Sequence, residues 1–300
     1  MKKIILCIIF LFLANICFTQ DYKKDFREAL LKQDTTIQLS ILREWEKNQP
    51  DDADIYISYL NYYFTKAKKE VIEITSGNSE EEIPLTKDST ENTVGYLGAK
   101  VSYDKAILQK GMDKIDKGIS LHPNRLDMRL GKIFTLGKIK SWNLFTDEIT
   151  KTIQHSSQNK NSWLWLNNEP LPEAKEVMLA SIQRYQQQLY ETGNDELLNN
   201  MQQIAQEVLA HYPNHVASLS NLAITHIFRK NYDEALEYLH KAERLNPNDG
   251  IVLANMAKVY ELKEDLLTSK VYYQKIAENP DIDVNLRQFA KDKIQSFNKK

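Results

Sequence analysis

The sequence predicts an all-α solenoid, a stack of about six helical hairpins closed by a C-terminal helix. The turn Tyr212-Pro213-Asn214 recurs 34 residues later as Asn246-Pro247-Asn248, and the segments that follow, residues 219–223 and 253–257, keep the same register. The chain has nine glycines and eight prolines in 300 residues, which suits long helices better than a turn-rich sheet protein. A pair of amphipathic helices cannot bury its apolar side alone, so the period predicts hairpins that stack on one another.

The clearest repeats span residues 216–249 and 250–281. The first contains large apolar residues, small residues and a closing proline at fixed spacing: Leu219, Leu222, Ala223, His226, Ala235, Leu239, Ala242 and Pro247. In this pattern the chain resembles the tetratricopeptide-repeat (TPR) family, as an exported bacterial TPR-domain protein. The resemblance implies a right-handed TPR-type solenoid, in which small residues let paired helices approach closely and a proline ends the second helix.

The period weakens toward the N-terminus, where Pro50 and Pro123 mark helix ends without clear repeats between them. The predicted hairpins are residues 21–50, 51–123, 124–170, 171–214, 215–248 and 249–281, followed by a capping helix over 282–300. The predicted organisation is degenerate helical repeats over 20–74 and 100–155, insertions at 75–99 and 156–172, and TPR repeats over 173–281. About 13 helices result from this organisation.

The first insertion, residues 75–99, is polar and contains the acidic run Glu80-Glu81-Glu82. Within it, residues 83–87 and 93–97 have strand-forming composition and flank a polar segment, so they could pair as a small β-hairpin. A disordered acidic loop is the alternative.

The second insertion, residues 156–172, contains Trp163 and Trp165, whose spacing puts both rings on one face of an extended segment. Paired indoles can stack on sugars or anchor a protein interface, so the two rings are candidates for a glycan or partner contact. A carbohydrate-binding or glycan-processing accessory is accordingly an alternative function. The favoured interpretation is structural: the two rings pack against neighbouring hairpins and seal an irregular joint.

Residues 1–19 have the pattern of a signal peptide, because two lysines precede the apolar run 4–14 and small residues at positions 17 and 19 allow cleavage before Gln20. We therefore expect an exported protein, periplasmic or secreted. Lipoprotein modification at Cys17 is disfavoured, because Ile16 stands where a small residue is required.

The composition of the chain argues against nucleic acid as a partner and against a membrane-spanning segment. The chain has 39 basic and 41 acidic residues, or 37 and 41 once the signal peptide and its two lysines are removed, a formal net charge of −4. No arginine-rich stripe occurs, so nucleic acid is not an expected partner. No segment after the signal peptide is apolar for about 18 residues, so no membrane-spanning helix is expected. Both cysteines lie in the predicted signal peptide, and the oligomeric state has no signature in the sequence.

No catalytic, cofactor-binding or metal-binding motif is recognisable, and we expect a protein without enzymatic activity. His211 and His215 have the spacing of a zinc pair, but Pro213 between them prevents a shared helical face. His226 occupies a position where the TPR family has an aromatic residue, so a packing role is expected. A hydrolase with a site assembled from distant residues is a further alternative, because it would leave no local motif.

The resemblance implies a concave groove lined by the first helix of each hairpin, with a protein or peptide as the partner. Two asparagines one repeat apart, Asn221 and Asn255, could hydrogen-bond an extended peptide. Clamp lysines found in some chaperone-binding members are replaced here by Ala217 and Ile251, so recognition of a C-terminal carboxylate is not implied. The predicted groove residues are Ser220, Asn221, Ile224, Ala254, Asn255 and Lys258.

Overall fold

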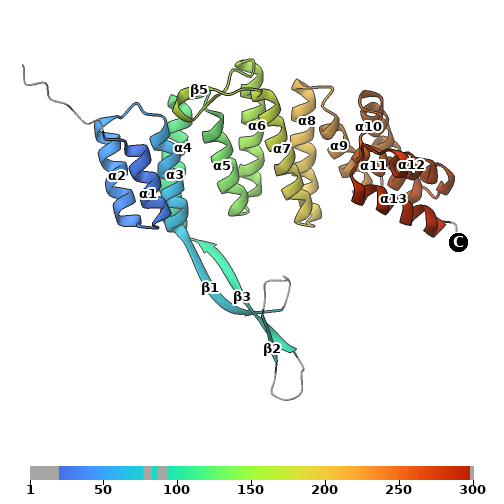
Figure 1. Ribbon diagram of the computed structural model, residues 1–300, viewed down its shortest axis with the longest axis horizontal. Helices are drawn as coiled ribbons and strands as arrows, with labels where there is room; N and C mark the ends of the chain where they lie inside the picture. The colour runs from blue at the N-terminus through green and yellow to red at the C-terminus, as the bar shows by residue number, and fades with distance from the viewer. Residues whose placement is uncertain (1–19, 77–82, 87–92, 298–300) are drawn as a thin grey trace, which may run out of the picture.

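A computed structural model describes residues 20–76, 83–86 and 93–297, and shows an elongated array of paired helices (Figure 1). The described residues form thirteen α-helices, arranged as six pairs and a terminal helix, α13, so the predicted all-α solenoid with its cap is confirmed. The predicted signal peptide and the run Glu80-Glu81-Glu82 lie outside the described residues. The helices are α1 Tyr22–Leu31, α2 Thr35–Asn48, α3 Asp54–Ala67, α4 Lys105–Leu121, α5 Leu126–Lys138, α6 Trp142–Gln158, α7 Ala174–Glu191, α8 Leu198–His211, α9 Val216–Phe228, α10 Tyr232–Leu245, α11 Gly250–Leu262, α12 Leu266–Glu278 and α13 Val284–Phe297.

Four of the six pairs are joined by the same tight turn, which contains one residue in the left-handed region. The four residues are Gln33, Lys140, Lys230 and Glu264, with φ between 55° and 64°. The residue after each donates a backbone hydrogen bond five residues back, as Ser141 N–H does to the Leu136 carbonyl at 3.0 Å. This bond satisfies a carbonyl that the helix end would leave free. The repeat therefore persists as turn geometry in α1–α2 and α5–α6, where the sequence pattern has faded.

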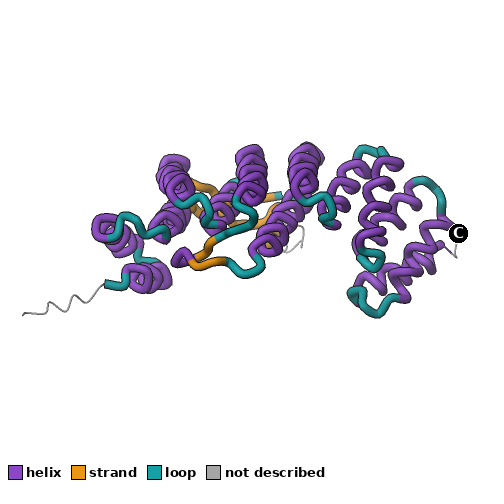
Figure 2. Tube along the Cα trace, turned by 90° about the horizontal axis from the view of Figure 1, so that it is seen from above, coloured by secondary structure: helices purple, strands orange, loops and turns teal. Residues whose placement is uncertain are grey.

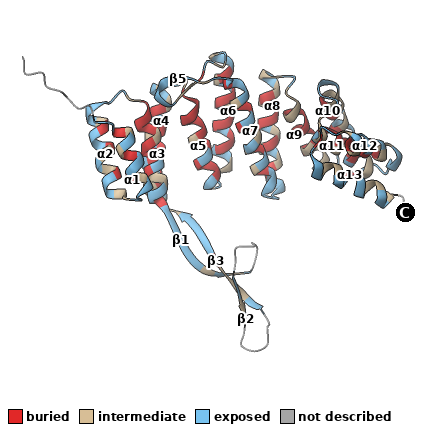
Figure 3. Cartoon of the chain, in the orientation of Figure 1, coloured by how far each residue is buried: buried red, intermediate tan, exposed pale blue. Residues whose placement is uncertain are grey.

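Buried residues lie along the helices where they adjoin their neighbours, whereas the strands β1 to β3 are mostly exposed (Figure 3). They form three clusters, one in α1–α3, a large one from α3 to α8, and one from α9 to α13. Leu219, Ala223, Ala235 and Leu239 are at most 1% exposed, as the repeat pattern predicts. Seen from above, the N-terminal helices appear nearly end-on and those near the C-terminus lie in side view, so the helix axes turn along the array (Figure 2).

A three-stranded antiparallel sheet projects from the junction of α3 and α4 (Figure 1). Its strands are β1 Lys68–Thr75, β2 Ile83–Thr86 and β3 Thr93–Tyr103, in the order β1-β3-β2. The predicted hairpin is confirmed, with Ile83 opposite Leu97.

The predicted limits of this insertion, 75–99, are wrong, because β1 begins at Lys68 and β3 continues to Tyr103. Residues 71–75 are Val-Ile-Glu-Ile-Thr, and their β-branched side chains favour a strand over the helix expected there.

The second insertion is shorter than predicted at its start and longer at its end, because α6 continues to Gln158 and α7 begins only at Ala174. It contains two short paired strands, β4 Leu164–Trp165 and β5 Glu169–Pro170, around a 3-10 turn, η2 Leu166–Asn168. Five of its residues are left-handed, three of them asparagines, which tolerate this conformation best after glycine: Lys160, Asn161, Asn167, Asn168 and Glu173.

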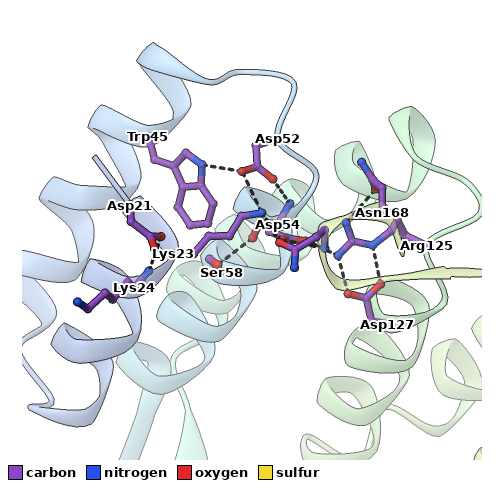
Figure 4. A network of polar contacts seen from close by, with 11 residues as sticks. Asp21, Lys23, Lys24, Trp45, Asp52, Asp54, Ser58, Arg125, Asp127 and Asn168 are labelled. Atoms are coloured by element: carbon purple, nitrogen blue, oxygen red, sulfur yellow. Dashed lines mark hydrogen bonds and ion pairs between the residues drawn. The ribbon is translucent and has the colours of Figure 1, made fainter. Parts of the chain in front are cut away.

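A buried ion network, here called the Arg125 clasp, fastens this insertion to the first helices (Figure 4). Arg125, whose side chain is 0% exposed, contacts Asp54 of α3 at 2.5 Å and Asp127 of α5 at 2.7 Å. Its Nη1 donates to Asn168 Oδ1 at 3.1 Å, and Lys23 of α1 contacts Asp54 at 2.7 Å. The clasp thus connects α1, α3, α5 and the second insertion through five side chains.

The clasp keeps Asp54 ionised. Burial alone would raise the pKa of this carboxyl, but the hydrogen bonds and charges of Lys23 and Arg125 outweigh burial and hold the pKa below its usual 3.8. A buried charge without such partners would be strongly destabilising, so the members of the clasp depend on one another.

Candidate functional site

The predicted groove residues lie on two inner helices, α9 and α11, the first helices of the last two hairpins. The 34-residue offset places Asn221 and Asn255 at equivalent positions of these helices. The preceding inner helix, α7, packs against α9 and continues the same row.

Asn221 is 6% exposed and its carboxamide is already bonded to the neighbouring inner helix. Its Nδ2 donates to Gln183 Oε1 of α7 at 2.7 Å, and Gln183 Nε2 donates back to Asn221 Oδ1 at 3.4 Å. Asn221 therefore couples two repeats.

Asn255 forms the equivalent link one repeat later. Its Nδ2 donates to Ser220 Oγ of α9 at 2.9 Å, and Ser220 itself is 3% exposed. Asn255 is half-buried, so it is more accessible to solvent than Asn221. We call Gln183, Asn221 and Asn255 the amide row, because they place one carboxamide on each of three successive inner helices.

The other three predicted groove residues differ in their access to a partner. Ile224 is half-buried against the large core of α3–α8, and Ala254 is half-buried against the C-terminal core. Lys258 is the exposed member of the six, with its ammonium 3.9 Å from the Glu261 carboxylate. The structure thus brings the six together along two helices but leaves only part of the set open to solvent.

The sequence did not predict Gln183 as a residue of the site. It lies 38 residues before Asn221, one helical turn away from the 34-residue offset, and the repeat around it is degenerate. An amide one turn out of register on the preceding inner helix would have been the signal for it.

The two tryptophans of the second insertion point into the protein. Trp163 is 1% exposed, with its ring 5.3 Å from the His155 ring and 5.8 Å from the Arg129 guanidinium. Trp165 is half-buried against the same core. Trp163 cannot offer its ring to a glycan while the segment is folded, so this placement counts against the carbohydrate-binding alternative and fits the packing interpretation.

The histidines singled out by their spacing have separate environments. His211 lies 3.2 Å from Glu207, whereas His215 Nδ1 lies 2.9 Å from Ser218 Oγ. Burial, with a smaller contribution from the Lys175 charge, lowers the pKa of His215. His226 stacks on Tyr238 with ring centroids 5.5 Å apart, which confirms its packing role.

The described residues contain no group of three or more potential metal ligands placed to hold an ion together. None of their helices combines the length and apolar character that crossing a membrane requires.

Comparison with known families identifies the repeat. Residues 216–249 match the model of the tetratricopeptide repeat. Residues 216–249 therefore form a tetratricopeptide repeat within the all-α solenoid. The matched segment covers α9 and α10, the hairpin in which sequence pattern and packing agree best. No curated protein matches the chain.

Solved structures with a similar arrangement of helices include a type IV pilus biogenesis factor, PilW, at 11% identity and a TM-score of 0.41, covering 89% of this chain and 96% of that one. Pseudomonas aeruginosa pilF has 18% identity and a TM-score of 0.37, covering 63% of this chain and 80% of that one. Acl4, an assembly chaperone of RpL4, has 8% identity and a TM-score of 0.38, covering 93% and 97%.

Proposed function

We propose that this protein is a non-enzymatic, exported adaptor that holds a segment of a partner protein along its inner helices. The observation that carries the proposal is the amide row, which repeats a carboxamide across α7, α9 and α11. Export rests on the signal-peptide pattern of residues 1–19.

The amide row suits an extended backbone. A carboxamide has two N–H donors and an oxygen with two acceptor positions, which is more than the bonds within the row use. Gln183 and Asn255 are half-buried and can meet a peptide directly, whereas Asn221 holds Gln183 in place. Main-chain hydrogen bonds of this kind give affinity with little demand on the partner's side chains.

Lys258 adds a charge beside the row, and the positions of clamp lysines hold Ala217 and Ile251. An internal segment of the partner therefore fits this groove better than a C-terminal carboxylate would.

Photo-crosslinking tests the proposal. A photoreactive residue is placed at position 258 on the inner helix α11 or, as a control, at the exposed position 237 on α10, and the exported protein is irradiated in extract of its source. We expect a crosslinked partner from position 258 and none from position 237, with a several-fold loss on Asn255→Ala. The intact mass of the exported protein should correspond to a chain beginning at Gln20.

The opposite crosslinking pattern, or capture unchanged by Asn255→Ala, would contradict the groove assignment. A far-UV circular dichroism spectrum of each variant excludes unfolding as the cause of any loss.

A further inference from the structure

A groove opens on the outer side of the array, between α4 and α6, the second helices of two successive hairpins. It encloses about 620 Å³, within the range of ligand-binding pockets. Helix α5 forms its floor, and the end of β3 forms part of its rim. It lies on different helices from the amide row.

The floor of the groove is apolar and its length matches a helix. Leu108, Met112 and Leu136 line it and are at most 9% exposed, whereas Leu144 at the rim is 59% exposed. Along α4 the lining positions are on one face of the helix over about 16 Å, and they are Lys105, Leu108, Gln109, Met112 and Asp116.

The rim of the groove carries an excess of positive charge. Lys132 is paired with Asp116 at 2.6 Å and Glu148 at 2.8 Å. Among the described residues, Asp147 is the lining carboxylate with no ion pair, and it is outnumbered by lysines that have no carboxylate partner there. These lysines are Lys105, Lys138, Lys140 and Lys151.

The projecting sheet extends this surface with an apolar face. Residues directly opposite in an antiparallel pair share a face, so the register of β1, β2 and β3 gathers seven apolar residues on one side: Ile72, Ile74, Ile83, Leu85, Leu97, Ala99 and Val101. Near the helices the same side also carries the ion pair of Lys68 with Glu70, the residue opposite Val101. Ile72, Ile74 and Ile83 are between 62% and 71% exposed. The other face is more polar, with Lys100 and Glu73 ion-paired at 3.0 Å, although Val71, opposite Lys100, is 55% exposed there. An uncovered apolar sheet face of this kind marks an interaction site.

Val101 joins the two parts, because it belongs to the apolar face of the sheet and also lines the groove. The groove and the sheet face therefore form one continuous surface, here called the outer surface.

We propose that the outer surface binds an acidic amphipathic α-helix of a partner protein. The helical walls, with Leu108 and Met112 on one side and Leu144 on the other, match a helix that inserts large apolar side chains between them. The four unpaired lysines match carboxylates on the flanks of that helix. A longer partner helix would continue over the sheet and cover its apolar face, as helices cover sheets within domains.

Synthetic peptides test this proposal with the intact protein. One helical peptide of about 16 residues carries leucines at i, i+3, i+4 and i+7 with flanking glutamates, a second has lysines in place of the glutamates, and a third is a scrambled sequence of the first. By fluorescence anisotropy we expect the acidic peptide to bind at least about tenfold more tightly than the other two, and to weaken as salt is added.

Variants locate the binding site. Leu144→Glu should weaken binding of the acidic peptide about tenfold, because a carboxylate then faces the leucines of the peptide. The double variant Lys140→Glu with Lys151→Glu should have a similar effect, because carboxylates then face the glutamates of the peptide. Ile72→Thr with Ile74→Thr keeps strand-forming residues and should weaken a longer peptide by about threefold. Matched controls are Leu267→Glu, at a position 82% exposed on α12, and Lys291→Glu on α13, both expected to leave binding unchanged.

Three results would overturn the proposal. The first is equal affinity for acidic and scrambled peptides, or binding that survives both groove variants. The second is self-association of the protein that Leu144→Glu abolishes, which would make a second copy the occupant. The third is lysine-dependent binding to anionic phosphatidylserine vesicles without peptide binding. Crosslinking from position 258 is independent of all three, so this inference and the proposed function can fail separately.

Discussion

The regular region, α9–α12, and the irregular region, α1–α8, hold their helices together in different ways. In the regular region the buried polar residues are uncharged and small alanines let the helices approach. Every buried charged residue in the described part of the chain lies in the irregular region: Asp54, Arg125, Asp127, Arg129 and Glu148. The difference teaches that where insertions interrupt the repeat, specific ion pairs are added to close packing as a means of fixing neighbouring hairpins.

The largest expected effect comes from breaking the Arg125 clasp. Arg125→Met leaves Asp127 and Asp54 buried without their guanidinium partner, and should lower the free energy of unfolding by about 3–5 kcal/mol. Urea denaturation followed by circular dichroism measures the change.

An ion pair of the regular region provides the control for this prediction. Lys263 contacts Asp233, which is 84% exposed, so Lys263→Met should cost less than about 1 kcal/mol. Equal losses for the two variants would show that the clasp has no special role in the irregular region.

Overpacking tests the regular region. Ala235 is 0% exposed between α9 and α10, so Ala235→Leu should force the two helices apart and lower the free energy of unfolding by about 1–3 kcal/mol. Thermal unfolding measures the loss. Ala180→Leu, at an exposed position of α7, is the matched control, and a similar loss there would contradict close approach as the cause.

The smallest expected effect is on stability in acid. The pKa of Asp54 in the folded chain lies below its usual 3.8, whereas in the unfolded chain it titrates at about 3.9. Its contribution is therefore complete above the unfolded value and is lost as the pH falls through the folded value. We expect the midpoint of urea denaturation to fall when the pH is lowered below about 4, and we expect Asp54→Asn to reduce this pH dependence.

Asp265 of the regular region is the control for the acid titration. Hydrogen bonds from Thr268, the backbone N–H first, lower the pKa of this exposed carboxyl at the start of α12. Asp265→Asn should change the acid dependence less than Asp54→Asn does. A larger change would show that the acid sensitivity of the protein arises in the regular region and not at the Arg125 clasp.

The helical pairs could be predicted because proline stops and apolar periodicity are local signals that recur along the chain. Strand β1 was not predicted, because no glycine or proline marks the end of α3 before residues 68–75. The Arg125 clasp could not be predicted, since Arg125 and Asp54 lie 71 residues apart and neither belongs to a motif.

The position of the candidate site could be predicted from the sequence, but the contacts of its side chains could not. Repeat spacing placed Asn221 and Asn255 on equivalent inner helices, yet it could not show that Asn221 is bonded to Gln183. Likewise, the spacing of Trp163 and Trp165 indicated a shared face but not that the face points inward. Which atoms a side chain meets depends on tertiary contacts, and a local pattern does not contain them.

The chain enters and leaves the sheet at neighbouring positions, where α3 ends and α4 begins. Asp104 N–H donates to the Ala67 carbonyl at 2.8 Å, and Lys68 stands opposite Tyr103, so the two helices are already joined where the strands start. The chain can therefore lengthen, shorten or exchange residues 69–102 without moving either helix. This junction is a grafting site, where one solenoid could acquire different projecting modules and with them different partners.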